Sequence, residues 1–322
     1  IISPGIHDSD SIPGSSRYVS ICKGTFRLGT VPHTYRLRCL VNQCMTLWNL
    51  RGVKPTVWHP TYYWTPPWRV KWPIALTVYD LIHEKCSALM SRSDPTIGLR
   101  RRSIKAARII FAISEATKRD LIEFYQIPEE RIWVTHLANG LRVDPVVPVM
   151  RVKPYLLFVG PRYEYKNFRL IVRMFDVWPT LAQRFDVICV GGGKPRGYEL
   201  GLGSNFVFFP SVSDNELASF YKNAFALVYP SRYEGFGLPL LEAMYYRCPV
   251  VTSACGSLPE VGGNAASYVD VDEPESLRAA VEELESEEFR RSRVLAGLAQ
   301  EKRFSWDKCA TRTLEGYKAI GG

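Results

Sequence analysis

Short apolar runs alternate with stretches of helical periodicity along most of the chain. Because each run is almost continuously apolar, we expect strands that are buried on both faces, as in parallel sheets covered by helices. Helical periodicity follows Lys166, Ser213 and Pro239 and returns over residues 274–320. The predicted strands are 56–59, 74–79, 109–113, 132–135, 155–159, 187–190, 206–208, 226–229 and 250–252.

A proline-rich segment at 144–154 separates the first four of these strands from the last five. It holds three prolines and no helical pattern, which is typical of a linker. We therefore predict an α/β fold with two doubly wound, Rossmann-like domains, residues 1–148 and 149–304, and a cleft between them. Residues 305–322 are predicted as a final helix that crosses back to the first domain. Ligands of such sheets bind beyond the carboxyl ends of the strands.

The composition is that of a folded protein with a large core. The 322 residues are 46% hydrophobic and 23% charged, and no apolar run reaches the 18 residues that a membrane helix needs. The eight cysteines are scattered without a C-x-x-C pair, which favours reduced thiols in a cytoplasmic protein over structural zinc. We expect neither a metal nor a cofactor. Because the sequence starts at Ile1, we also expect that it lacks its natural N-terminus.

The excess positive charge lies in the first half of the chain. Residues 1–150 hold 20 basic and 11 acidic side chains, whereas the remaining residues hold 21 of each. This asymmetry predicts an anionic partner that touches one domain, and residues 98–108 alone carry five cations. Since no nucleic-acid-binding motif is found, we expect no nucleic-acid partner. Three interpretations remain: peripheral association with the inner face of an anionic membrane, a phosphorylated substrate, and a basic surface that is merely solvated.

The strongest candidate for chemistry is the segment 230–243, Pro-Ser-Arg-Tyr-Glu-Gly-Phe-Gly-Leu-Pro-Leu-Leu-Glu-Ala. A buried strand leads into a glycine-bearing loop and then into a helix with Pro239 in its first turn. Free N–H groups and the positive end of that helix suit a phosphate or a sugar hydroxyl. Glu234 and Glu242 can bind hydroxyls at two points along one extended ligand. The alternative is a glycine turn and a helix with two solvated glutamates.

A second candidate is the segment 158–167, Phe-Val-Gly-Pro-Arg-Tyr-Glu-Tyr-Lys-Asn. It again combines a buried strand, a glycine turn and a helix, now with two cations at the turn. Arg162 with its planar fork and Lys166 as a point charge could clamp a diphosphate. The alternative is that these two cations are merely solvated at the start of the helix.

These segments resemble the C-terminal domain of the family-4 glycosyltransferases, which are retaining enzymes of the GT-B fold. The first half matches more weakly, around His59, Tyr79-Asp80 and Asn139-Gly140. The motifs that carry the resemblance are V-G-x-R-x-x-x-K-N at 159–167, E-G-F-G-L-P-x-L-E-A at 234–243, P-V-V at 249–251, G-S-L-P-E-V at 256–261 and F-S-W at 304–306.

The resemblance implies a role for most of these residues. Arg162 and Lys166 would hold the nucleoside diphosphate and neutralise the leaving group. Glu234 would bind hydroxyls of the donor sugar, and Glu242 would bind the ribose. The remaining candidates are Asp80 among the catalytic residues, Gly160, Gly191, Gly235, Phe236, Gly237 and Leu238 around the donor, and His59, Tyr79 and His83 on the acceptor side.

Two features depart from the family. Many relatives have His-Asp where this chain has Tyr79-Asp80, and His83 follows four residues after Tyr79. The family's first strand and glycine-rich loop are not found within residues 1–18, so we expect the first domain to lack them.

The sequence therefore predicts a retaining, metal-independent glycosyltransferase of polysaccharide biosynthesis. It would move a sugar from a nucleoside-diphosphate sugar to a glycan or lipid-linked acceptor, with GDP-mannose as our first choice of donor by resemblance to mannosyl- and rhamnosyl-transferring relatives. One alternative is a catalytically inactive sugar-nucleotide or glycan-binding protein of the same fold. Another is an NAD-dependent oxidoreductase, suggested by Gly191-Gly192-Gly193 after a buried strand, although Lys194-Pro195 disrupts the helix that such a site requires.

Overall fold

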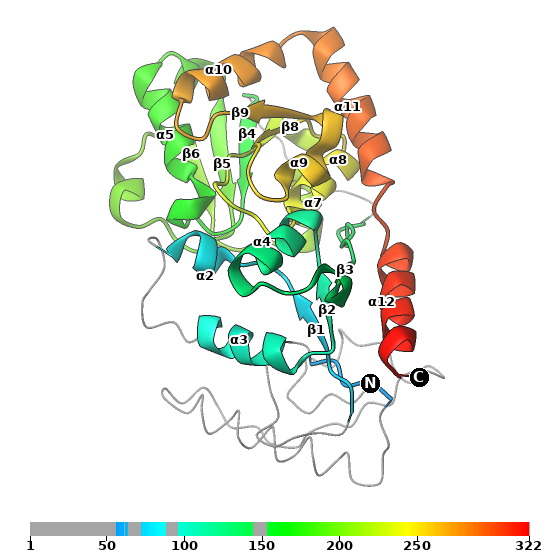
Figure 1. Cartoon of the computed structure of the whole chain (residues 1–322). Helices are drawn as coiled ribbons and strands as arrows, with labels where there is room; N and C mark the ends of the chain where they lie inside the picture. The colour runs from blue at the N-terminus through cyan, green and yellow to red at the C-terminus, as the bar shows by residue number, and fades with distance from the viewer. Residues whose placement is uncertain (1–55, 61, 64–71, 88–95, 144–152, 322) are drawn as a thin grey trace. The chain divides into compact units, whose positions relative to one another are not determined.

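A computed structural model of the chain describes residues 56–60, 62–63, 72–87, 96–143 and 153–321 (Figure 1). The chain divides into two compact units, residues 1–58 with 65–73, and residues 59–64 with 74–322. In the first unit, the N–H of Trp58 donates to the carbonyl oxygen of Pro73 at 2.9 Å, and the rings of Trp58 and Trp72 lie 6.5 Å apart. All helices and strands described below belong to the second unit.

Six parallel strands form the larger sheet of the second unit, in the order β6-β5-β4-β7-β8-β9. The order reverses at β4, because β5 pairs with one of its edges and β7 with the other. The crevice beyond the carboxyl ends of strands at such a reversal is the usual ligand site of doubly wound sheets. The strands are β4 (Tyr155–Val159), β5 (Asp186–Val190), β6 (Phe206–Phe209), β7 (Ala226–Tyr229), β8 (Val250–Ser253) and β9 (Ala266–Val269).

Helices cover both faces of this sheet. Along β4, Tyr155 and Leu157 face a core shared with α7, α8 and α9, whereas Leu156 and Phe158 face a core shared with α5 and α10. This two-sided burial explains why the strands read as continuous apolar runs. The helices are α5 (Phe168–Val177), α6 (Leu181–Arg184), α7 (Asp214–Asn223), α8 (Leu238–Tyr245), α9 (Leu258–Gly262), α10 (Pro274–Glu283) and α11 (Glu287–Glu301), with 3-10 turns at Glu164–Lys166, Gly197–Gly201 and Gly263–Ala265.

A second parallel sheet has the described strands β1 (Ala75–Val78), β2 (Ile109–Ala112) and β3 (Ile132–Val134), in that order. The last helix of the chain, α12 (Trp306–Gly321), packs against β2 and β3 (Figure 1). A Cβ on Gly316 would lie 2.6 Å from the Phe111 ring, so the absence of a side chain allows this close packing. The other elements are α2 (Ile82–Lys85), α3 (Thr96–Ala106), α4 (Glu115–Tyr125) and a 3-10 turn at Glu129–Arg131.

Most predicted elements are confirmed, with two exceptions. The predicted strand at 56–59 is wrong: Trp58 forms a single bridge, and Pro60 just beyond it has no N–H to continue a ladder. The strand β9 was missed, because its four residues mix apolar and polar side chains.

The helix predicted after Ser213 is confirmed as α7, and it starts with a capping box. The hydroxyl of Ser213 accepts from the N–H of Glu216 at 3.3 Å, and the Glu216 carboxylate accepts from the N–H of Ser213 at 2.8 Å. The predicted boundary at 148 and 149 lies outside the described residues, as do residues 1–18. Within the part of the chain that the structure describes, no helix is both long and apolar enough to cross a bilayer.

Candidate active site

The turn after β4 and the loop after β7 meet at the reversal point of the six-stranded sheet. The N–H of Arg232 on the β7 loop donates to the carbonyl oxygen of Tyr165 on the β4 turn at 2.7 Å. The Lys166 ammonium donates to Glu234 Oε1 at 2.6 Å. The fold therefore brings Lys166 and Glu234, predicted separately from two motifs, into direct contact.

This ion pair is almost withdrawn from solvent. Lys166 is 8% exposed, and its ammonium also donates to the hydroxyl of Tyr229 at 2.5 Å. Burial, together with the charge of Glu234, raises the pKa of Tyr229 well above its ordinary value, so the phenol stays neutral and accepts the bond. Removing one partner would leave an unpaired buried charge, which costs about 3–5 kcal/mol.

Arg162, by contrast, is directed into the protein. Its side chain is 3% exposed, and Nε donates to the Glu199 carboxylate at 2.8 Å. Its two terminal nitrogens donate to the carbonyl oxygens of Gly191 at 2.8 Å and Gly193 at 3.0 Å. The guanidinium therefore fixes the glycine turn after β5 and does not join the Lys166–Glu234 pair.

That turn needs glycine for two reasons. Gly191, Gly192 and Gly193 have φ values of +84°, +73° and +76°, which side chains rarely adopt. A Cβ on Gly192 would also lie 2.9 Å from the Arg162 guanidinium. Gly160 in the turn after β4 has φ +108° and donates its N–H to Val190 at 2.8 Å, which joins the two turns.

The loop that carries Glu234 is anchored to the three-stranded sheet. A Cβ on Gly235 would lie 2.0 Å from the carbonyl oxygen of Tyr79 and 2.9 Å from Cβ of Asp80. The Gly235 carbonyl accepts from the hydroxyls of Ser114 at 2.7 Å and Thr117 at 3.3 Å. Tyr79 and Asp80, which follow β1, are thus held against the residue next to Glu234.

Three further side chains hold this loop, and none of them has a role assigned from the sequence: Tyr233, Asp120 and Ser257. The buried Tyr233 hydroxyl donates to Asp120 at 2.8 Å and accepts from the N–H of Leu81 at 3.0 Å. The Ser257 hydroxyl donates to the carbonyl oxygens of Glu234 at 2.9 Å and Phe236 at 2.7 Å. Ser257 lies in a motif that was recognised, whereas no local signal distinguishes Tyr233 from other tyrosines.

Glu260 makes another link between the two sheets. Its carboxylate accepts from the N–H of Glu115 at 3.0 Å, at the start of α4, and also contacts the ring of His136. Burial alone would raise the pKa of Glu260, but these bonds hold it below the ordinary value.

Four more of the candidates predicted on the donor side lie in or next to α8. Gly237 precedes the helix with φ +105°, Leu238 is its first residue, and the buried Phe236 ring packs against the rings of His136 and Phe304, which also contact each other. Glu242, within the helix, accepts from the hydroxyl of Tyr221 at 2.7 Å. Burial raises the pKa of Glu242, and the bond from Tyr221 offsets this only in part.

The three acceptor-side candidates differ in accessibility. Both ring nitrogens of His59 are occupied, by Thr77 Oγ1 at 2.9 Å and by the hydroxyl of Tyr317 at 2.5 Å. Burial lowers the pKa of His59 to about 4, so it is a neutral group that ties β1 to α12. Tyr79 is 39% exposed, and His83 is half-buried on α2.

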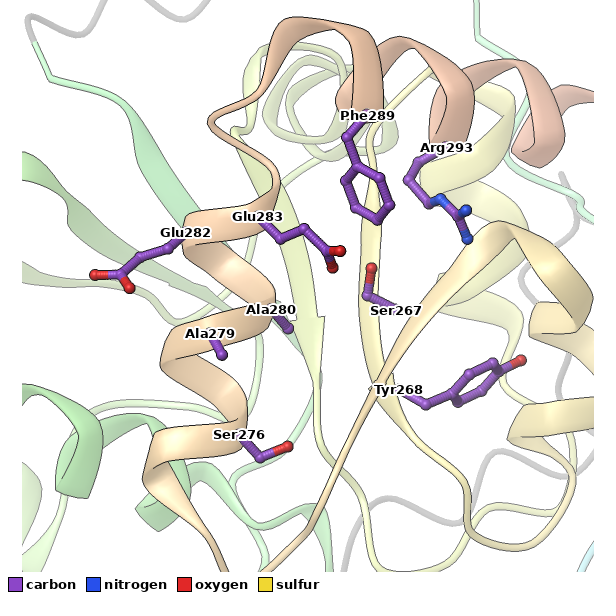
Figure 2. A pocket seen from close by; sticks show the side chains of 9 residues that line it. All are labelled: Ser267, Tyr268, Ser276, Ala279, Ala280, Glu282, Glu283, Phe289 and Arg293. Atoms are coloured by element: carbon purple, nitrogen blue, oxygen red, sulfur yellow. The ribbon is translucent and has the colours of Figure 1, made fainter.

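Two hollows of the surface are lined by none of these candidates. One, of about 450 Å³, includes His136, Phe304, Lys308 and Arg312. The other, of about 690 Å³, lies over β9 between α10 and α11, where Glu283 and Phe289 flank Ser267 (Figure 2). Among the described residues, no group of three or more His, Cys, Asp and Glu side chains could hold a metal ion.

Comparison with known proteins gives the family. The family model described as glycosyl transferases group 1 matches residues 148–300, which include both loops of the site. O-antigen chain mannosyltransferase B of Escherichia coli is 30% identical over 298 residues, which are 85% of this chain and 77% of that protein. The chain belongs to the group 1 glycosyltransferases.

Other proteins similar to this group 1 glycosyltransferase agree. O-antigen chain mannosyltransferase RfbU of Salmonella typhimurium is 30% identical over 194 residues, 58% of this chain and 54% of that protein. Among solved structures, sucrose-phosphate synthase from Thermosynechococcus elongatus superposes with a TM-score of 0.77 at 18% identity, covering 99% of this chain and 88% of that one.

WaaG, a glycosyltransferase involved in lipopolysaccharide biosynthesis, superposes with a TM-score of 0.69, also at 18% identity, and covers 93% of this chain and 85% of that chain. The predicted GT-B fold, the family and the glycosyltransferase activity class are therefore confirmed. These matches favour an active glycosyltransferase over the two alternatives that the sequence left open.

Proposed function

We propose that this group 1 glycosyltransferase transfers mannose from GDP-mannose to a glycan or lipid-linked acceptor during assembly of an O-antigen-type polysaccharide. The names of the two mannosyltransferases to which it is similar support the sugar and the pathway class. The observation that carries the proposal is the buried Lys166–Glu234 pair at the reversal point of the sheet, where a donor would bind.

The pair suits the charge that develops in the reaction. As a nucleoside diphosphate departs from the anomeric carbon, negative charge grows on the phosphate oxygen. The Lys166 ammonium and the positive end of α8 are fixed charges that stabilise this oxygen without reorganisation, and we propose that no metal is needed. Glu234 Oε1 faces Lys166, and we assign its carboxylate to the hydroxyls of the donor sugar.

We assign Arg162 an indirect part in donor binding. Its donors are bonded to Glu199, Gly191 and Gly193, so it would shape the glycine turn that approaches the diphosphate. Glu242, which lies within α8 and is held by Tyr221, would accept hydrogen bonds from the ribose hydroxyls. Same-face attack, with retention of the anomeric configuration, is what the family resemblance implies for the chemical step.

A lipid-linked acceptor would lie at a membrane, and α3 offers a basic surface for it. Arg101, Arg102 and Lys105 are exposed on this helix. Arg100, counted among the five cations of the predicted basic stretch, is buried and cannot contribute. At about 1 kcal/mol per cation near an anionic surface, changing all three to glutamate should abolish sedimentation with phosphatidylglycerol vesicles. Unchanged sedimentation would exclude this face.

The activity can be tested before the acceptor is identified. The chain is incubated with GDP-mannose or UDP-glucose in excess EDTA, and release of the nucleotide and the sugar is followed by NMR. Slow hydrolysis of GDP-mannose alone, with the released mannose initially in the α configuration, supports the proposal. Hydrolysis of UDP-glucose alone, or an initially inverted product, would overturn the donor or the stereochemistry.

A further inference from the structure

Arg100 on α3 is a buried cation that the site described so far does not use. It is 1% exposed, and its guanidinium stacks 4.8 Å from the ring centroid of Tyr63. One terminal nitrogen contacts the Glu84 carboxylate, and the other lies 3.6 Å from Asp80 Oδ1. Its planar fork thus reaches two carboxylates beyond the end of β1: Asp80, in the loop that follows the strand, and Glu84, on α2.

Glu84 is the buried carboxylate partner of this charge. Its side chain is 8% exposed, it contacts Arg100, and it also accepts from the hydroxyl of Tyr125. Burial by itself would lower the pKa of Arg100, but Tyr63, Glu84 and Asp80 together raise it, so the guanidinium remains charged. A buried cation needs one well-bonded counterion, and Glu84 supplies it.

Asp80 is the exposed end of this network. Its side chain is 38% exposed, in contrast to Arg100 and Glu84. Oδ1 of Asp80 accepts from the N–H of Ile82 at 3.1 Å, and its Cβ is where a side chain at Gly235 would collide. A carboxylate in this place stands beside the Glu234 loop and is open to solvent.

We propose that Arg100 is a positioning residue, which holds the Asp80 carboxylate at the Glu234 loop so that it can accept a hydrogen bond from a hydroxyl of the acceptor. The inference rests on the proposed function, because it assumes that sugar transfer occurs at this loop. Lysine could not replace arginine fully, since an ammonium lacks the fork that reaches Glu84 and Asp80 together.

A matched pair of variants separates this role from a purely structural one. Glu84→Gln keeps Arg100 with Asp80 as its remaining carboxylate, and the new amide can still bond to the guanidinium and to Tyr125. The double variant Arg100→Met/Glu84→Gln leaves no unpaired buried charge but deprives Asp80 of its cation. We expect kcat of transfer to stay within about threefold of the parent in the single variant and to fall about 100-fold in the double variant, with KM for the donor unchanged.

The same comparison on an Asp80→Asn background tests whether Arg100 acts through Asp80. There, replacing Arg100 should cost less than threefold further. Equal losses in the single and double variants, or full additivity with Asp80→Asn, would overturn the proposal. Arg100→Lys should be faster than the Arg100→Met/Glu84→Gln variant and slower than the parent, because lysine keeps the charge but lacks the fork.

A readout that needs no activity distinguishes failure of this inference from failure of the proposed function. Hydrogen exchange at the N–H of Ile82 reports whether Asp80 still accepts its bond. We expect exchange to rise at least tenfold in the double variant and not in Glu84→Gln. Equal exchange in both would refute the positioning role, even if the enzyme proves to use another sugar donor.

Discussion

Two carboxylates, Glu234 after β7 and Asp80 after β1, lie on loops that contact each other and are held in different ways. Glu234 follows a strand in the middle of the six-stranded sheet, and its cation, Lys166, comes from the turn after the adjacent strand β4. Asp80 follows the edge strand of the described three-stranded sheet, and its cation, Arg100, comes from a helix. Among the residues that the structure describes, Lys166 pairs with one carboxylate, whereas Arg100 divides its charge between two.

The difference separates two ways to fix an acidic group at a site. Parallel pairing of β4 with β7 brings the ends of both strands together, so the strand pattern itself delivers Lys166 to Glu234. Asp80 has no charged partner on a neighbouring strand of its sheet among the described contacts. It depends on a buried network of side chains from α2, α3 and α4. Substitutions should therefore affect the two regions differently.

The largest effect is expected at Lys166. Lys166→Met should lower kcat/KM at least 100-fold, because it removes the fixed charge that we assign to the departing phosphate. It should also destabilise the fold by about 3–5 kcal/mol, since Glu234 becomes an unpaired buried charge. Denaturant unfolding and steady-state kinetics measure the two losses.

A second variant and a control separate the two losses. Lys166→Met/Glu234→Gln should regain most of the stability and none of the activity. Arg169→Met, a nearby exposed cation, should change neither quantity. Recovery of activity in the double variant would show that the pair is structural only.

Gly235→Ala tests the contact between the two carboxylate-bearing loops. The new Cβ would lie 2.0 Å from the Tyr79 carbonyl, so one loop must move, at a cost of about 1–3 kcal/mol and most of the activity. Gly140→Ala is the matched control, because nothing lies within 4 Å of its Cβ. If both variants unfold at the same denaturant concentration, the contact is looser than the structure indicates.

His59, which is bonded to the three-stranded sheet, should make the free energy of unfolding depend on pH. The folded protein protonates this ring only near pH 4, whereas an unfolded histidine takes up its proton near pH 6.5. Between these values the unfolded state binds more protons, so stability falls as the pH is lowered, by about 3 kcal/mol in total. His59→Asn should flatten this dependence in urea titrations at pH 4 to 6.5; an unaltered slope would mean that other groups cause it.

The smallest effect concerns Glu242. Tyr221→Phe removes its hydrogen-bond partner, and we expect KM for the donor to rise about fivefold with kcat unchanged. Tyr155→Phe removes a comparable buried hydroxyl, bonded to the Phe220 carbonyl in the same core. Tyr155→Phe should lower the free energy of unfolding about as much as Tyr221→Phe does, without altering KM. A change of KM in both variants would point to the core and not to Glu242.

Residues fixed by local strand and turn geometry could be predicted from the sequence. Lys166 and Glu234 each lie in a glycine-bearing loop that follows an apolar strand, and the sheet order then brings them together. Arg162 could not be oriented in the same way, because its partner Glu199 lies 37 residues away. An arginine at a glycine turn gives the same sequence pattern whether its guanidinium binds a ligand or other groups of the protein.

The basic stretch on α3 misled for a related reason. A run of arginines usually marks a solvated face, and nothing in the pattern distinguishes Arg100 from Arg101. Burial of Arg100 depends on Glu84 and Tyr63, which reach it only in the folded chain. Likewise His59 pairs with Tyr317, a contact across 258 residues that no local signal could indicate.

We propose that Lys166 and Glu234 form a metal-free binding site for a guanosine-diphosphate sugar. Calorimetric titration of GDP and of UDP in excess EDTA tests it most directly, on the parent chain and on Lys166→Ala. The account predicts micromolar binding of GDP, much weaker binding of UDP, and at least a tenfold loss of GDP affinity in the variant. GDP binding that requires a divalent ion, or that is unchanged by Lys166→Ala, would contradict it.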